Sequence, residues 1–429
     1  MNNLVWFGNN LRVQDNNSLF ESCKKSGKTI GVYCIDPRIF EISKHGFKKT
    51  EKFRAKFLLE TLRDLKKNLH NYNISLLVYF DTPENIIPKL VAEHQIGTIF
   101  LQKEWTPDEL KISDILKTNE HLTHIKWIET YDQFLFHPND IPYIGFDKIP
   151  EVFTEFRKKC EKESKIKPCV KILSKNEDNL IANATQIPTL PDLGFENFEV
   201  HKNTAFPFQG GESQALKRIE NYFFETENLS EYKKTRNGLV GESYSSKLSA
   251  WLANGSISAR TIYWEIKQYE SEICKNEDTY WLFFELIWRD YFKYISLKHG
   301  DKIFKLDGIL QKPYDWKNSD KAFKQWAFGN TNEPFVNANM LELLETGFMS
   351  NRGRQNVASF WSKEWLQDWR KAAAYFESML IDYDVHSNYG NWMYNSGVGN
   401  DPRDRKFNIK RQAEMYDGNG KYQQLWNEN

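Results

Sequence analysis

Hydroxyl groups and one lysine gather in the second half of the sequence, where they could bind an anion. Tyr232 and residues 243–249 (SYSSKLS) precede a helical pattern, AWLANGSISARTIYWEIKQYE. Free backbone N–H groups at a helix start favour negative charge, so these side chains suit a phosphate. Serine also caps helices without any ligand, and from the local sequence this simpler interpretation is the stronger one.

A second candidate is a carboxylate among apolar and aromatic residues in YWLFFELIWRDYF, residues 280–292. The residues that share one face at helical spacing are Leu282, Glu285, Trp288, Arg289 and Phe292. An unpaired buried charge is unfavourable, so Glu285 needs a partner. A ligand or an internal salt bridge could supply it, and the sequence leaves both open.

A third candidate is the stretch GFMSNRGRQNVA, residues 347–358, where two arginines lie beside amides. Guanidinium groups suit phosphate or carboxylate. The spacing predicts that Asn351, Arg352 and Gln355 share a helical face, with Arg354 turned elsewhere. Taken alone this signal is weak, because charges at a helix start are usually only solvated.

The fourth candidate is LIDYDVHSNYGNW, residues 380–392. Asp382, Asp384 and Asn388 could satisfy the polar edge of a ring system, with Trp392 one turn beyond Asn388. A metal site built from Asp382, Asp384 and His386 is the weaker alternative, because no other carboxylate or histidine clusters nearby in the sequence. We therefore expect no bound metal.

Different patterns predict the elements that must position these residues. Short apolar runs that read as strands alternate with helical patterns in the first 130 residues, the clearest helical pattern being residues 51–71. The strand-like runs are Leu4–Phe7, Thr29–Ile35, Ile74–Phe80, Thr98–Leu101 and His124–Ile128. This alternation predicts a doubly wound parallel α/β sheet. No GxGxxG motif follows the first run, which disfavours a dinucleotide-dependent dehydrogenase.

The chain is expected to have two domains and a connector. Residues 1–133 form the predicted α/β domain, and residues 134–206, rich in Pro, Asn and Lys, form a long connector with one helical piece near residues 152–162. Residues 207–429 show helical periodicity without strand-like runs, which predicts an all-α domain.

Composition restricts the class of protein. Aromatic residues make up 15% of the 429 residues, with 14 tryptophans, which favours a flat conjugated partner. The net charge is zero, so any nucleic acid must bind through a local basic patch. The five cysteines show no CxxC or metal spacing, and no apolar stretch approaches the length of a membrane span. We expect a soluble, cytoplasmic protein.

In this order and spacing, the four stretches resemble the flavin-binding helical domain of the photolyase and cryptochrome family. The opening WFGNNLRVQDN is similar to that family's WFRxDLRxxDN. Finer features resemble its DASH branch, namely FPFQGGESQALKRI, YKKTRNGLVGESYSSKLSAWLA, GFMSNRGRQNVASF and NYGNWMYNSGVGNDPRDRKFNIKRQAEMYD. The resemblance covers essentially the whole chain.

The resemblance implies FAD, folded into a U inside the helical domain. The positions that would contact it are Tyr232, Ser245, Ser246, Lys247, Leu248, Ser249, Arg289, Asn351, Arg354, Asp382, Asp384 and Asn388. Arg354 would pair with Asp382 beside the isoalloxazine, and Asn388 would face flavin N5. An amide at that place tolerates both neutral and anionic flavin, whereas a carboxylate would repel the anion.

The resemblance also implies blue-light repair of cyclobutane pyrimidine dimers in DNA, by electron transfer from excited reduced flavin. Glu285 would hydrogen-bond the dimer, Trp288 and Tyr394 would form aromatic walls, and Gln355 would line the pocket with Asn351 and Arg352. Family members commonly carry Trp where this chain has Tyr394 and Met where it has Gln355. Less stacking surface should favour single-stranded DNA, in which extruding the dimer is easiest.

A tryptophan series is implied to carry electrons from the surface to the flavin, in the order Trp316, Trp369, Trp392. Trp361, Trp365 and Trp369 also recur every four residues, and without the resemblance this stripe would be interpreted as one packed helix face.

The DASH branch usually binds a second chromophore, methenyltetrahydrofolate, at the carboxyl ends of the α/β strands. Glu104 matches an acidic residue that contacts this folate. Gly8 and Asn10 replace a charged pair of the family, which would loosen the domain interface. We expect a monomer, with photoreceptor signalling as the main alternative to repair and a light-independent flavin reductase as a weaker one.

Overall fold

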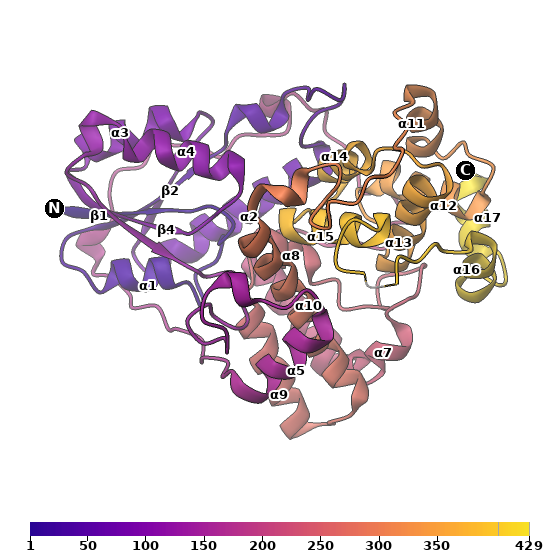
Figure 1. Cartoon of the computed structure of the whole chain (residues 1–429). Coiled ribbons are helices and arrows are strands. Elements are labelled where there is room, and N and C mark those ends of the chain that lie inside the picture. The colour runs from indigo at the N-terminus through magenta and orange to yellow at the C-terminus, as the bar shows by residue number, and fades with distance from the viewer. Residues whose placement is uncertain (402, 429) are drawn as a thin grey trace.

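The computed structural model describes residues 1–401 and 403–428, and its first 130 residues contain a parallel five-stranded sheet (Figure 1). The strands are β1 (Asn2–Trp6), β2 (Thr29–Cys34), β3 (Ser75–Tyr79), β4 (Ile96–Gln102) and β5 (Lys126–Thr130). They lie in the order β3-β2-β1-β4-β5, and every neighbouring pair is parallel. The predicted doubly wound α/β sheet is confirmed, with strand ends shifted by one to a few residues from the expected runs.

Helices cover both faces of this sheet because alternate strand residues point to opposite sides. Val5 of β1 packs in one core with Leu19 of α1 (Asn17–Cys23) and Leu62 of α2 (Lys52–His70). Leu4, its neighbour, packs in another core with helices α3 (Pro83–Glu93) and α4 (Pro107–Lys117). A strand that is covered on both faces needs apolar side chains on both, which explains the continuous apolar runs in the sequence.

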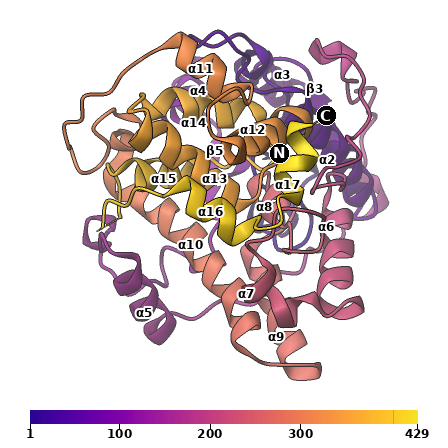
Figure 2. The same cartoon turned by 90° about the vertical axis from the view of Figure 1, so that its right-hand side faces the viewer.

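After the connector the secondary structure of the described residues is helical, as predicted (Figure 2). The helices of this part are α6 (Glu212–Ile219), α7 (Tyr232–Thr235), α8 (Ser249–Ala253), α9 (Ala259–Glu272), α10 (Glu277–His299), α11 (Asp320–Ala327), α12 (Pro334–Thr346), α13 (Asn351–Ser359), α14 (Trp369–Met379), α15 (Val385–Ser396), α16 (Ile409–Tyr416) and α17 (Lys421–Asn427). The long helix α10 begins at a capping box formed by Asn276 and Thr279. It runs through the middle of the helical part, beside α15 and α7.

The connector contains one α-helix, α5 (Phe153–Glu163), where the sequence predicted a helical piece. Its extended part follows the outer edge of the sheet, because the backbone N–H of Val78 in β3 donates to Thr185 and Asn183 donates to the carbonyl of Leu76. This contact satisfies part of an edge strand that would otherwise expose its backbone.

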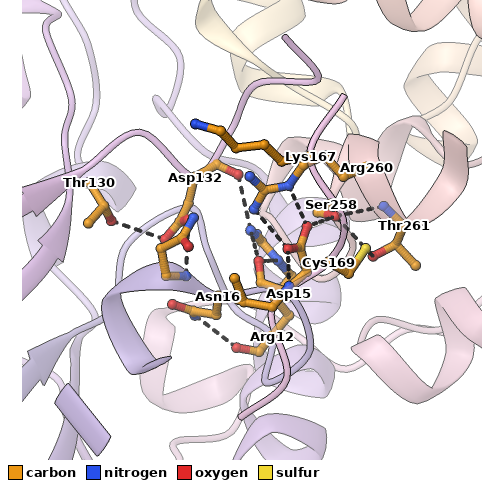
Figure 3. A network of polar contacts seen from close by, with 12 residues as sticks. Arg12, Asp15, Asn16, Thr130, Asp132, Lys167, Cys169, Ser258, Arg260 and Thr261 are labelled. Carbon is orange, nitrogen blue, oxygen red and sulfur yellow. Dashed lines mark hydrogen bonds and ion pairs between the residues drawn. The ribbon is translucent and has the colours of Figure 1, made fainter. Parts of the chain in front are cut away.

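A buried polar network joins the α/β part to the helical part (Figure 3). We call Arg12, Asp15, Asp132, Ser258 and Arg260 the interdomain network. Arg260 donates to both oxygens of Asp15 at 2.8 and 2.9 Å, and Ser258 donates to Asp15 at 2.6 Å. Arg12 donates to the carbonyls of Asp15, Asp132 and Gly255. The bonds of this network do not involve Gly8 or the side chain of Asn10, and the expectation that these two residues loosen the interface stays a prediction.

Two predicted helices are interrupted. The pattern after Ser249 is not one helix, because α8 ends at Ala253 and α9 begins at Ala259. Gly255 lies between them with a left-handed φ of +74°, and a Cβ there would lie 2.0 Å from the backbone oxygen of Asn9. The chain therefore bends here to let the two domains approach closely.

The stripe of Trp361, Trp365 and Trp369 is also not one helix face. After α13 the chain forms a π-helical turn, Phe360–Glu364, in which the N–H of Trp365 donates to the carbonyl of Phe360. A new helix, α14, begins at Trp369 with Asp368 as its cap. Trp361 and Trp369 are buried, whereas Trp365 is only half-buried.

Candidate functional site

A cavity of about 80 Å³ lies between α13, α15 and the segment that joins α14 to α15. We call it the α13–α15 pocket. Its lining is Asn351, Arg354, Gln355, Ala358, Phe376, Leu380, Asp382, Tyr383, Asp384, Ser387, Asn388, Asn391, Trp392 and Asn395. Polar and aromatic side chains from the third and fourth candidate stretches thus meet at one place, as a polar ring system would require.

One terminal nitrogen of the Arg354 guanidinium donates to both carboxylate oxygens of Asp382 at 2.9 Å, so the predicted pairing is confirmed. The prediction that Arg352, and not Arg354, shares a helix face with Asn351 is wrong. Asn351, Arg354 and Gln355, at spacings of three and four, are the residues of α13 that line this pocket. Arg352 instead donates to Gln355 and Asn237 and lies over the ring of Tyr416.

Asp384 caps helix α15 and also pairs with Lys293 of α10 at 2.7 Å. Burial opposes ionisation, but the nearby cations Lys293 and Arg289, together with His386, hold the pKa of Asp384 well below its usual range. The two helices approach closely because Gly390 faces Phe292, whose ring would lie 2.3 Å from an added Cβ. A permanently ionised carboxylate is therefore fixed at the pocket wall.

Asn388 and Trp392 line the pocket one turn apart on α15. The side-chain N–H of Asn388 donates to the carbonyl of Ala373 at 3.0 Å, which fixes the orientation of the amide. Trp392 is buried and packs on Trp326 and Phe376. Trp369 packs on Tyr389, and Trp316 packs on Tyr314.

The carboxylate of Glu285 pairs with Arg236 at 2.7 Å, so an internal salt bridge satisfies it in this structure. Burial raises the pKa of Glu285, and Arg236 opposes that shift. Trp288, one turn along α10, stacks on Phe153 at 3.6 Å and meets Tyr394 edge-on at 6.0 Å. The two aromatic residues predicted to form walls therefore lie together.

Tyr394 opens onto a second cavity, of about 310 Å³, lined by Arg352, Gln355, Tyr394, Asn395, Asp401, Arg405, Phe407 and Gln412. Arg405 donates to the hydroxyl of Tyr394 at 2.7 Å and is held by Asp401. Gln355 and Asn395 line both cavities. The predicted cofactor and substrate residues are thus adjacent, with Gln355 between them.

The predicted phosphate loop, residues 245–249, is buried at its centre, with Ser245 half-buried and Ser249 exposed. Ser246, Lys247 and Leu248 are buried, and Ser249 starts the short helix α8. Arg218 fixes the loop by donating to the carbonyls of Glu242, Ser245 and Ser246. Tyr232 is buried at the start of α7 and Arg289 donates to the carbonyls of Gln133 and Leu252, so neither lines the α13–α15 pocket.

Lys247 has an unusual environment within this loop. It has a left-handed φ of +61°, and its ammonium lies over the ring of Tyr244 without a hydrogen-bond partner. Burial lowers its pKa, while Glu342 opposes the shift. Tyr244, Lys247, Glu342 and Phe348 form what we call the Lys247 cluster. A hydroxyl, an ammonium and one carboxylate oxygen of this cluster lack partners, as expected for a site that an anionic, hydrogen-bonding ligand completes.

Glu104 lies half-buried in the loop after β4 and accepts a bond from Gln102 at 2.7 Å. Burial raises the pKa of Glu104 to about 7. The next residue, Trp105, stacks on His386 at 4.6 Å and donates to Ser296. This loop therefore packs directly on α10 and α15, beside Lys293 and Asp384.

Sequence reasoning missed several residues of this region. Lys293 lies one turn beyond Arg289 on the same helix face, so helical spacing could have found it. Arg218, Arg236 and Trp105 act across long sequence separations, and no local pattern predicts their partners. Within residues 1–401 and 403–428 no cluster of His, Cys, Asp or Glu could hold a metal ion. None of the helices in the same ranges is long and apolar enough to cross a membrane.

Two family models match the chain. Residues 3–173 match the model of DNA photolyase, and residues 281–428 match the FAD binding domain of DNA photolyase.

Curated relatives match the chain almost from end to end. Cryptochrome DASH of Gloeobacter violaceus is 44% identical over 99% of this chain and 85% of its own length. Cryptochrome DASH of Xenopus laevis is 43% identical over 97% of this chain and 81% of its own length. The crystal structure of a Synechocystis cryptochrome superposes with a TM-score of 0.92 at 41% identity, covering 99% of this chain and 88% of that one.

Proposed function

The chain belongs to the photolyase and cryptochrome family, in its DASH branch, and from this premise we propose that it repairs cyclobutane pyrimidine dimers, chiefly in single-stranded DNA, using bound FAD and blue light. Family membership supports FAD binding and a light-related role in DNA repair or photoreception. The observation that carries the finer proposal is the adjacency of the α13–α15 pocket to the aromatic pair Trp288 and Tyr394.

FAD fits the residues present. The Arg354–Asp382 pair, Asp384, Asn388 and Asn351 would hold the polar edge of the flavin, with the loop of residues 245–249 and Tyr232 at the phosphates. The unpaired ammonium of Lys247 supports an anion near this loop, because a buried cation without a partner is unfavourable. When bound, FAD supplies the light absorption and the electron; the protein orients it and sets its electrostatics.

The dimer would enter between Trp288 and Tyr394 and reach Glu285. The ion pair of Glu285 with Arg236 holds this carboxylate ready as an acceptor, and a dimer base can share it by donating a hydrogen bond. Arg405 fixes the Tyr394 ring through its hydroxyl, while Arg352 and Gln355 line the adjoining cavity. Tyr394 offers less stacking surface than a tryptophan would, so we expect weak capture from duplex DNA.

We also propose that methenyltetrahydrofolate binds the α/β domain next to Glu104. With a pKa of about 7, this carboxyl can either donate or accept a hydrogen bond. Denaturing extraction of the purified protein should release folate in the wild type and little from Glu104→Ala. Equal folate from both proteins would contradict this assignment.

The monomeric state, the cytoplasmic location and the domain bounds at residues 133 and 206 are further parts of the proposal. Light scattering of the purified protein and fractionation of cells test the first two. Proteolysis tests the third, with cleavage expected within residues 134–206.

Blue-light repair of a thymine-dimer oligonucleotide, single-stranded and duplex in parallel, tests the proposed reaction. Glu285→Ala should lower single-strand repair by about tenfold to a hundredfold, because the dimer loses the hydrogen bond that orients it in the site. Glu277→Ala, at the exposed start of the same helix, is the matched control and should repair normally. No repair of either substrate by protein with bound, photoreducible FAD would reject the lyase and leave a photoreceptor.

A further inference from the structure

A chain of tryptophans outside the predicted series begins at the α13–α15 pocket. Trp392 lines this pocket, and its ring packs on Trp326 of α11 with the centroids 6.2 Å apart. Trp326 packs on Trp361 at 5.1 Å, and Trp361 packs on Trp365 at 6.5 Å. Each step joins neighbouring indole rings, and electron tunnelling is fastest between rings in contact.

We propose that Trp326, Trp361 and Trp365 form a second electron-transfer route between the surface and the flavin, beside the route through Trp369 and Trp316. This inference rests on the proposed flavin photochemistry. With FAD bound and excited by light, Trp392 would give one electron to the oxidised flavin, and Trp326, Trp361 and Trp365 would replace that electron in turn. The oxidised Trp365 loses its indole proton to water and is reduced again by an external thiol, which supplies one electron and one hydrogen ion.

The environment of the inner rings suits a transient positive charge. The indole N–H of Trp326 donates to the carbonyl of Val357 at 3.3 Å, and that of Trp361 donates to the carbonyl of Asp368 at 2.9 Å. A carbonyl oxygen at the indole nitrogen stabilises positive charge on the ring. Both rings are buried, so a hole on either ring is shielded from solvent quenching and passes to the next tryptophan.

The outer end of the route reaches solvent. Trp365 is half-buried, and the exposed residues Glu364 and Leu366 flank it. The π-helical turn Phe360–Glu364 places Trp365 five residues from its hydrogen-bond partner, Phe360, and the rings of Trp365 and Trp361 still lie 6.5 Å apart. Turns of this kind are rare and are often found at functional sites.

Ordinary core packing is the competing explanation, because aromatic rings in cores commonly lie 4.5–7 Å apart. The two explanations differ when Trp is replaced by Phe, which keeps an aromatic ring but is far harder to oxidise. If these tryptophans only pack, replacing them by Phe should lower stability without slowing electron transfer. If they form a redox route, the replacement should slow electron transfer even when the fold is kept.

The test uses the FAD-loaded chain, with the rate of flavin photoreduction in blue light and excess thiol as the first measurement. We expect Trp369→Phe to retain part of the wild-type rate, and the double variant Trp326→Phe/Trp369→Phe to fall at least about tenfold below Trp369→Phe. Trp251→Phe replaces a buried tryptophan outside both routes and should match the wild type. Equal rates for Trp369→Phe and the double variant, or complete loss in Trp369→Phe alone, would overturn the route.

A second measurement keeps the proposal testable if Trp326→Phe does not fold. Trp365→Phe changes only the half-buried end. In the Trp369→Phe background it should leave the outermost tryptophan radical on Trp361, which shortens the flavin–tryptophan distance measured by transient electron paramagnetic resonance. An unchanged distance would overturn the proposal. Repair by protein whose flavin is reduced chemically bypasses both routes, so failure of that assay in the wild type rejects the repair function and not this route.

Discussion

The interdomain network and the Lys247 cluster are both buried and both charged, but their polar atoms differ in how they are satisfied. In the network, Asp15 accepts bonds from Arg260, Ser258 and the backbone N–H of Val170. In the cluster, the ammonium of Lys247 and one oxygen of Glu342 have no partner. A buried charge that the protein satisfies by itself holds the fold together, whereas one left unpaired marks a place that a ligand completes.

Removing one partner of the interdomain network should have the largest effect on stability. Arg260→Ala leaves the carboxylate of Asp15 buried without its cation and should lower the free energy of unfolding by about 3–5 kcal/mol. Urea denaturation of the FAD-free chain measures this. Arg38→Ala, which removes an exposed ion pair with Asp36 and Glu84, is the control and should change stability by about 0–1 kcal/mol. Equal losses of stability in Arg260→Ala and Arg38→Ala would show that the buried network stabilises the fold no more than an exposed ion pair does.

The next effect concerns pH. Burial raises the pKa of Glu342 from 4.5 to about 7, so its contribution to stability is full below pH 4.5 and is lost as the pH rises through 7. Glu342→Gln should remove about 3 kcal/mol of this pH dependence. Unfolding curves between pH 4 and about pH 8 measure it.

Glu212 is the matched control for that change. It accepts the backbone N–H groups of Val13 and Gln14, and burial raises its pKa to about 7 as well. Glu212→Gln should flatten the stability curve in the same pH range but leave FAD affinity unchanged, whereas Glu342→Gln should change FAD affinity. Identical FAD binding by both variants would contradict the assignment of Glu342 to a ligand-completed cluster.

Lys247→Met should have a smaller effect on stability, and in the opposite direction. It removes an unpaired buried ammonium while keeping the same backbone, so the FAD-free chain should become more stable by about 1–3 kcal/mol. FAD affinity should fall, because the anion loses its cation. Thermal unfolding and FAD titration check both. A less stable chain that binds FAD normally would show that Lys247 serves the fold alone.

Gly8→Ala should have the smallest effect. A Cβ at Gly8 meets nothing within 4 Å, so the change in unfolding free energy should stay within about 0.5 kcal/mol. Comparing Gly8→Ala with Arg260→Ala, which removes the partner of Asp15, separates contacts of the N-terminal segment that hold the interface from residues that only lie near it. A large effect at Gly8 would mean that the interface extends beyond the network.

Helical and strand periodicity predicted much of this architecture correctly. Apolar runs predicted the central strands because strands buried on both faces are apolar throughout, whereas the edge strand β5 is exposed or half-buried along its length and only partly apolar. The stretch with Asp382 and Asp384 was recognisable from its residue types, whereas the pair of Arg354 with Asp382 was predicted only through the family resemblance, because no local pattern joins these two positions. The helix face of α13 was predicted less well, because neighbouring positions 351 and 352 were assigned to one side.

The sequence alone thus determined the fold class, the family resemblance and the side chains from which a flavin site can be built, because residue periodicity and motif spacing are local properties. Tertiary structure decided the partners. The sequence left open whether a ligand or a salt bridge satisfies Glu285, and in the folded chain Arg236 pairs with it. The tryptophan stripe was compatible with one helix face, but a π-helical turn divides it. Contacts such as Arg260 with Asp15 or Trp392 with Trp326 join residues far apart in the chain, and only the packing of whole domains brings them together.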